Sequence, residues 1–241
     1  MTAVFIWLPL LSGLLGGLVG MTLKGRLTRD VKILLAFSGA YLLSLSVLHL
    51  LPEIYSGHGE SAEMYILLGF LLQMILDYFS RGVEHGHIHH HDTSKFPLGI
   101  FIGLFLHSLV EGLPLAGNHI LHSHTHGLEG EGLLFGIVVH KIPEAMALAA
   151  LLHFHFLKKS KVFLYIFIYS LATPLGVGLG HLLLISDIED PQALYTKILA
   201  VTVGIFLHVS TTIIFEADES HRLSWRKIIA ILSGLGLVLL I

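Results

Sequence analysis

Eight apolar segments of membrane-spanning length follow one another along the 241-residue chain, with short polar connections between them. A helix needs about 20 apolar residues to cross the hydrocarbon core of a bilayer. Backbone groups in that core must bond within the segment, so we expect each segment to be a helix. The segments lie at about 2–23, 31–55, 62–80, 97–117, 131–157, 161–185, 193–215 and 224–241.

The composition agrees with a protein built from such helices. Apolar residues make up 54% of the chain and charged residues 13%, and the mean hydropathy is +0.80. These values are typical of a polytopic membrane protein, so we expect one all-α domain over 1–241. The chain has no cysteine and five methionines. It therefore lacks a disulfide framework and the soft sulfur ligands expected of a copper(I) carrier.

Lysine and arginine occur in alternate connections, and this pattern predicts how the chain is oriented in the membrane. The connections near 56–61, 118–130 and 186–191 contain neither residue. The connections after the first, third, fifth and seventh segments contain Lys24, Arg26, Arg29, Lys32, Arg81, Lys95, Lys158, Lys159, Lys161, Arg222, Arg226 and Lys227. Because basic connections stay in the cytoplasm, we expect both termini outside. The expected location is a bacterial inner membrane or an equivalent cell membrane.

Two segments carry a histidine followed four residues later by a glutamate. These pairs are His107 and Glu111 in the fourth segment, and His140 and Glu144 in the fifth. On a helix, residues four apart lie on one face, about 6 Å apart along the axis. Each pair therefore offers one imidazole and one carboxylate in the same direction, near the middle of its span.

Four such side chains at matching depth indicate a bound cation or a polar path, because an uncompensated carboxylate there is costly. The two segments are joined only by the connection 118–130 and must run antiparallel, which brings His107 level with Glu144 and Glu111 level with His140. Two imidazoles and two carboxylates suit Zn²⁺ and are acceptable to other divalent first-row metals. The alternative is a set of salt bridges between helices or hydrogen-bonded core histidines.

Three prolines lie within the fourth, fifth and sixth segments: Pro114, Pro143 and Pro174. Each removes one backbone hydrogen bond and frees a carbonyl one turn earlier, which is tolerated where the helix lines a cavity. Broken helices at mid-depth are a common sign of a transporter site.

Glycines recur three or four residues apart in the first and sixth segments, a spacing that lets membrane helices approach closely. They are Gly13, Gly16, Gly17 and Gly20, and Gly176, Gly178 and Gly180. We expect these two helices to pack against the pair that carries the ligands. Ordinary bundle packing without any function is the alternative.

Two further sites lie away from mid-span. His49 and Glu53 form a third pair at the outer end of the second segment and suggest an entrance site. A histidine and a glutamate at the membrane surface are also inexpensive to keep without a function. His155 lies on the same stripe of its helix as His140 and Glu144, and we interpret it as an exit position.

Histidine-rich connections lie at 84–92 and 119–126. They contain His85, His87, His89, His90, His91, His119, His122, His124 and His126. Such tracts bind zinc-type ions loosely, so we expect local metal capture on each face of the membrane. A solvated polar linker is the alternative.

Together these features resemble the ZIP (Zrt/Irt-like) divalent metal transporters. The resemblance covers the whole chain and is carried by the eight segments, the stretches at 49–53, 107–112 and 140–144, and the histidine-rich connection 84–92. It implies uptake of Zn²⁺, or of Cd²⁺, Fe²⁺ or Mn²⁺, into the cytoplasm, without an organic cofactor or a nucleic acid partner. It also implies an elevator-like motion of helices 1, 4, 5 and 6 against helices 2, 3, 7 and 8 in the bilayer, often in a homodimer.

The same resemblance implies that His107, Glu111, His140 and Glu144 form the primary metal site. Many family members have a second site beside it, and the corresponding positions here are Ser108, Lys141 and Thr173. Because these residues supply neither a carboxylate nor an amide, we predict one metal per site, with the Lys141 ammonium near the place of a second cation. A fixed salt bridge from Lys141 to a glutamate is the alternative.

The main functional hypothesis is a membrane carrier for a divalent ion. The rival from another class is an intramembrane zinc-dependent hydrolase, which would keep an open metal position for activated water. No His-x-x-x-His or His-Glu-x-x-His stretch lies within a span, which argues against the rival. A metal sensor or a channel stays open, since sequence alone does not separate a gated pore from a moving carrier.

Overall fold

A computed structural model describes residues 3–22, 29–56, 61–80, 98–117, 128–155, 158–186, 188–216 and 224–240. Within these ranges, every regular element is a helix, as expected for an all-α protein. The elements are α1 (Val4–Thr22), α2 (Arg29–Leu45), the π-helix η1 (Ser46–Leu50), α3 (Leu51–Ser56), α4 (Ala62–Ser80), α5 (Leu98–Gly112), the 3₁₀-helix η3 (Leu113–Ala116), α7 (Leu128–His155), α8 (Lys159–Ser170), α9 (Ala172–Ile185), α10 (Pro191–Glu216) and α11 (Trp225–Val238).

Seven helical segments in the described ranges are long and apolar enough to cross a membrane. Three of them combine consecutive elements: α2 with η1 and α3, α5 with η3, and α8 with α9. The eighth expected segment is helical as well, but α11 has only 14 residues. This is fewer than the about 20 residues that a helix needs to span the hydrocarbon core.

Prolines account for the places where a helix changes its hydrogen bonding. Pro52 is the second residue of α3, which begins where the π-helical turn η1 ends, and Pro114 lies in the 3₁₀ turn η3. Pro174 is the third residue of α9, just after the turn at Leu171 that separates α8 from α9. These irregularities have the expected cause, because proline cannot donate to the carbonyl four residues earlier. The helix α7, in contrast, continues through Pro143.

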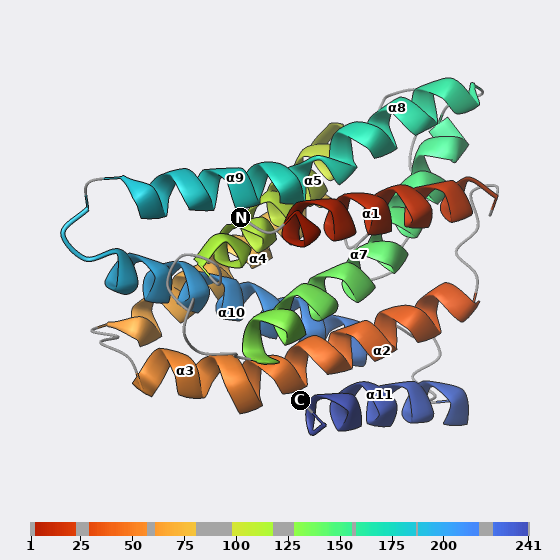
Figure 1. Cartoon of the computed structure of the whole chain (residues 1–241). Coiled ribbons are helices and arrows are strands. Elements are labelled where there is room, and N and C mark those ends of the chain that lie inside the picture. The colour runs from red at the N-terminus through yellow and green to blue at the C-terminus, as the bar shows by residue number, and fades with distance from the viewer. Residues whose placement is uncertain are drawn as a thin grey trace.

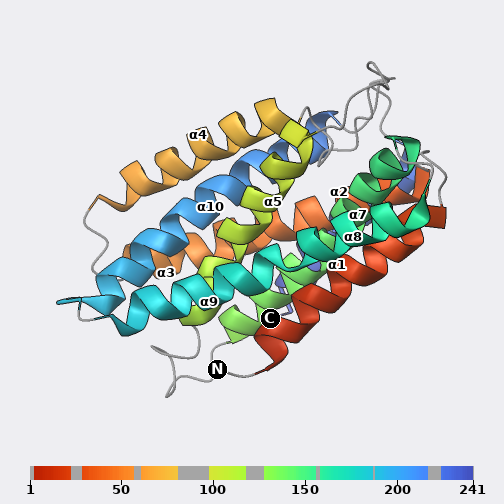
Figure 2. The same cartoon turned by 90° about the horizontal axis from the view of Figure 1, so that it is seen from above.

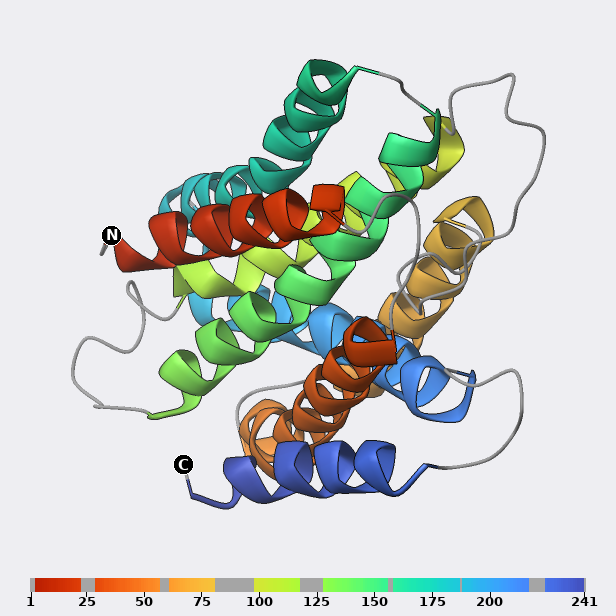
Figure 3. The ribbon, with the colours of Figure 1, turned by 90° about the vertical axis from the view of Figure 1, so that its right-hand side faces the viewer.

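The helices pack as two groups that meet along a shared boundary. In one group, α1 lies against α7 and α8, and α5 lies against α9. In the other, α4 lies against α10, and α11 lies against α2; these neighbours are visible in Figures 1 and 2. Contacts of α2 with α7 and of α4 with α5 join the groups. The helix α1 begins and α11 ends on the same side of the bundle, at the left of Figure 3.

Glycine contacts explain the close approach of α1 to α7 and of α9 to α5. A Cβ on Gly16 would collide with the carbonyl oxygen of Ile142 on α7, and a Cβ on Gly176 with that of Leu109 on α5. Only a residue without a side chain allows the backbones to come this close. The expected packing of the first and sixth segments against the ligand-bearing helices is confirmed.

Candidate metal centre

Four side chains that can bind a metal ion lie together in the interior, where α5 and α7 approach each other. His107 and Glu111 come from α5, and His140 and Glu144 come from α7. All four side chains are fully buried. Their i, i+4 spacing places each pair on one helix face, as expected from the sequence.

The distances show how closely these groups approach. His107, His140 and Glu144 each offer one ligand atom, and these three atoms all lie within 4.8 Å of one another. The ring centroids of His107 and His140 are 6.1 Å apart. Glu111 is not part of this group of three, but its Oε1 lies 3.1 Å from Nε2 of His107. The antiparallel arrangement therefore brings three of the four predicted ligands together, with the fourth in contact with one of them.

The carboxylates lie near His107 and Tyr169 but lack a regular hydrogen bond to either side chain. Among the described residues, all four carboxylate oxygens of Glu111 and Glu144 are buried and accept no hydrogen bond of good geometry. A buried charge without a partner is costly, and buried ions are normally paired or bound to a metal. Two adjacent acids beside two imidazoles can therefore bind a divalent cation.

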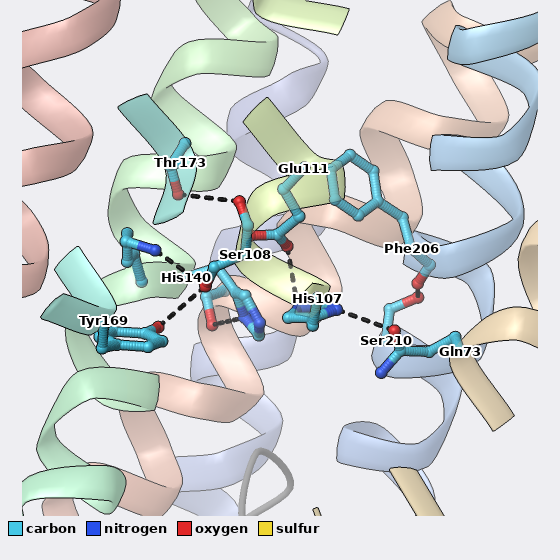
Figure 4. Close-up of polar contacts among 11 residues, drawn as sticks. Gln73, His107, Ser108, Glu111, His140, Tyr169, Thr173, Phe206 and Ser210 are labelled. Atoms are coloured by element: carbon cyan, nitrogen blue, oxygen red, sulfur yellow. Dashed lines mark hydrogen bonds and ion pairs between the residues drawn. The ribbon is translucent and has the colours of Figure 1, made fainter. Parts of the chain in front are cut away.

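Each imidazole also contacts a polar side chain through Nδ1. His107 Nδ1 lies 2.8 Å from Oε1 of Gln73 on α4, and His140 Nδ1 lies 3.4 Å from Oγ of Ser38 on α2. Figure 4 shows His107 between Gln73 and Glu111. Neither Gln73 nor Ser38 was predicted from the sequence. An isolated glutamine within an apolar span was a signal for Gln73, whereas no signal distinguished Ser38 from the other serines of α2.

A second polar group lies beside the acids and contains the three residues for which the sequence predicted altered second-site positions. Lys141 Nζ donates to Oγ of Ser108 at 2.8 Å, and Thr173 Oγ1 donates to the Ser108 carbonyl at 3.1 Å. Ser108 in turn donates to the Tyr169 hydroxyl at 3.2 Å, and the Lys141 ammonium lies 4.4 Å from the centroid of the Tyr169 ring. Figure 4 shows Ser108 between Tyr169 and Thr173. Tyr169 was not predicted from the sequence either.

The alternative of a fixed salt bridge for Lys141 does not match these contacts. Within the described part of the chain, no ion pair links Lys141 to Glu111 or Glu144. The ammonium is fully buried, and its charge is stabilised by a hydroxyl and an aromatic face. Lys141 therefore adds a positive charge beside the acids without binding to either of them.

Other predicted residues lie elsewhere or outside the description. His49 is in η1 and Glu53 in α3; both are partly buried, and neither belongs to the group formed by His107, His140 and Glu144. His155 ends α7, but its side chain lies outside the described structure. The histidines of the two histidine-rich connections also lie outside the described residues: His85, His87, His89, His90, His91, His119, His122, His124 and His126.

Comparisons with known proteins agree with this picture. A family model described as ZIP Zinc transporter matches residues 84–241, which include α5 and all helices after it. Zinc transporter ZIP1 of Danio rerio is 25% identical over 158 residues, which is 64% of this chain and 50% of that protein. The chain thus spans about half the length of this curated relative.

Proposed function

Because the chain belongs to the ZIP zinc transporter family, we propose that it carries a divalent metal ion, first of all Zn²⁺, across the membrane into the cytoplasm. His107, Glu111, His140 and Glu144 bind the ion between α5 and α7. The ion exchanges its water for two imidazole nitrogens and two carboxylates, and it leaves without any covalent step. Cd²⁺, Fe²⁺ and Mn²⁺ are further candidates, because His and Glu ligands accept all of them to some degree.

One observation carries this proposal. Two buried carboxylates without a good hydrogen-bond donor lie in one place with two buried imidazoles. Inside a membrane such a cluster is costly unless a cation or a proton compensates it. A site of this kind can select a divalent ion, and its mixed nitrogen and oxygen ligands keep binding reversible.

The site holds one metal ion, and Lys141 takes the place of a second one. The three positions at which many family members supply further ligands are Ser108, Lys141 and Thr173, and they contact one another here. They offer two hydroxyl groups and an ammonium in place of carboxylates. A second cation beside Lys141 would meet a like charge in a low dielectric, which is strongly unfavourable.

We further propose eight spans, with both termini outside. The start of α1 and the end of α11 lie on the same side of the bundle. A chain that begins and ends on one side crosses the membrane an even number of times. With seven long spans, α11 supplies the eighth crossing despite its 14 residues, since a bilayer adapts to a short helix at modest cost. A homodimer and a bacterial inner membrane, or an equivalent one, complete the proposal.

Metal uptake into sealed vesicles tests the function. Glu111→Ala and His140→Ala should each abolish metal-dependent uptake, because each removes one of four ligands, while the purified proteins remain folded by circular dichroism. His153→Ala is the matched control, since His153 lies on α7 but outside the metal-binding group. Normal uptake by both site variants would contradict the assignment of the site.

The alternative of an intramembrane hydrolase receives no support. The family to which the chain belongs consists of transporters and not of enzymes. Two carboxylates on one zinc ion would also lower its power to acidify a bound water.

A further inference from the structure

Both histidines of the candidate metal centre are contacted from outside by side chains of the opposite helix group. Gln73 on α4 reaches His107 on α5, and Ser38 on α2 reaches His140 on α7. These contacts cross the two boundaries, α4 with α5 and α2 with α7, along which the helix groups meet. They are therefore contacts between separate helices and not a consequence of local spacing.

Gln73 is exceptional on its helix. Its neighbour Met74 is 49% exposed at the surface of the bundle, whereas Gln73 itself has no exposed area. Burying an amide without hydrogen bonds is costly. The 2.8 Å contact with His107 Nδ1 offsets part of this cost and explains why an amide is tolerated inside an apolar helix.

The two contacts determine which ring nitrogen carries the hydrogen. The Gln73 atom at His107 is the amide oxygen, which can only accept, so Nδ1 of His107 must donate. Ser38 uses its hydroxyl hydrogen to donate to the Leu35 carbonyl at 3.0 Å, so its oxygen accepts from Nδ1 of His140. In a neutral imidazole with a hydrogen on Nδ1, the lone pair that binds a metal is on Nε2.

His107 also points its Nε2 toward the acids of the site, where a cation between Nε2 and Glu111 would bind both lone pairs. Its Nε2 lies 3.1 Å from Oε1 of Glu111, on the side of the ring opposite to Gln73. A metal-binding histidine commonly donates its other N–H to a carbonyl or carboxylate, which fixes both the tautomer and the orientation of the ring.

We propose that Gln73 and Ser38 are positioning residues that hold His107 and His140 with Nε2 turned into the site. This inference rests on the proposed function, because it assigns the metal-binding nitrogen of that same site. The shorter contact makes Gln73 the stronger of the two. Neither residue touches the ion; both act through the imidazole that they orient.

Zinc affinity of the detergent-purified protein tests the proposal. Gln73→Leu keeps the shape of the side chain but removes the acceptor, and it should weaken Zn²⁺ binding by about 10- to 100-fold, as for other outer-shell partners of metal-binding histidines. Gln73→Glu keeps an acceptor oxygen and should retain affinity close to that of the wild type. Ser38→Ala should give a smaller loss in the same direction. Zinc that still binds to His107→Ala is subtracted as binding outside the site.

Two matched controls separate positioning from general packing. Ser12→Ala removes a buried hydroxyl that bonds only to the carbonyl three residues earlier; Ser38 makes the same backbone bond but also contacts His140. Thr202→Val removes a buried hydroxyl of α10 that bonds to the Ile198 carbonyl. Both controls should keep wild-type zinc affinity.

The tautomer gives a readout that a purely structural role would not change. Nitrogen-15 spectra of the zinc-bound protein, with the His107 signal identified by its loss in His107→Ala, should show the hydrogen on Nδ1 of His107. That signal should become a mixture of tautomers in Gln73→Leu and remain unmixed in Gln73→Glu. A hydrogen on Nε2 in the wild type would overturn the proposal, and so would equal affinities of Gln73→Leu and the wild type.

The outcomes distinguish this inference from the proposed function. If wild-type protein and His107→Ala bind zinc equally, the metal site itself is wrong. If His107→Ala loses the site but Gln73→Leu keeps full affinity and an unchanged tautomer, only the positioning role fails.

Discussion

At the scale of single residues, Lys141 reduces the negative charge of the candidate metal centre. With both glutamates ionised and Lys141 protonated, the metal-free site carries a net charge of −1, and a divalent ion with neutral histidines changes it to +1. Without Lys141 the metal-free site would carry −2. A smaller charge is less costly to hold in a low dielectric. We expect Lys141 to let the carrier return without metal, although no acid binds it directly.

Lys141→Ala should therefore slow net zinc uptake more than it slows the exchange of labelled for unlabelled zinc. Net uptake includes the return of the metal-free site, whereas exchange of labelled for unlabelled zinc across the vesicle membrane returns a loaded site. We expect a loss of about tenfold or more in net uptake, because each 1.4 kcal/mol added to a barrier costs a factor of ten. Exchange should change much less.

One control keeps the positive charge at position 141, and the other removes a lysine from a different position. Lys141→Arg retains the charge and should keep most of the net uptake. Lys197→Ala removes an exposed lysine of α10 that also lies over a ring, that of Tyr65 at 5.7 Å, and should have no effect. Equal effects of Lys141→Ala on exchange and net uptake would show that the charge does not govern the return step.

At the scale of elements, the contact between α9 and α5 places the second-site positions beside the centre. Gly112 and Gly176 face each other, and a Cβ on either would come within 3.0 Å of the other residue's Cα. Membrane helices associate through such small residues, because lipid gives no hydrophobic drive between them. This close contact is what lets Thr173 reach the carbonyl of Ser108.

Gly176→Ala should destabilise the protein, whereas Gly178→Ala should not. An added methyl at Gly176 meets the Leu109 carbonyl, and such overpacking costs typically about 1–3 kcal/mol. A methyl at Gly178 meets no atom within 4 Å, and replacing glycine inside a helix stabilises it by roughly 0.5–1 kcal/mol. Thermal unfolding in detergent measures both. Equal midpoints for the two variants would contradict the packing role of Gly176.

At the scale of the whole molecule, orientation decides the direction of transport. The basic residues of alternate connections predict that α8 begins on the cytoplasmic side and that α9 ends outside. Together these two helices form one candidate span, from Lys159 to Ile185. Ser160 and Ser186 lie at its two ends and are both exposed.

Cysteine labelling tests this orientation in a background that needs no prior mutation, because the chain has no cysteine. An impermeant maleimide added to intact cells should label Ser186→Cys and should reach Ser160→Cys only after the membrane is opened. Serine and cysteine have nearly the same size, so both variants should keep the fold. The reverse pattern of labelling would invert the predicted direction of uptake.

Local features of this protein were predictable from its sequence. The long apolar segments are confirmed as helices, because apolar composition and unsatisfied backbone groups leave no other solution in a membrane. The contact between His107 and Glu111 follows from their spacing on one helix. The breaks at Pro114 and Pro174 follow from the missing N–H of proline.

Only the tertiary structure decided which distant groups meet. It showed that Gln73 and Ser38 contact the histidines and that Lys141 lies against Ser108 and Tyr169 rather than against an acid. Helix periodicity gives the face on which a side chain lies, but not which helix faces it or at what depth. Those contacts depend on how closely separate helices pack, and therefore on side-chain volumes and glycines far apart in the chain.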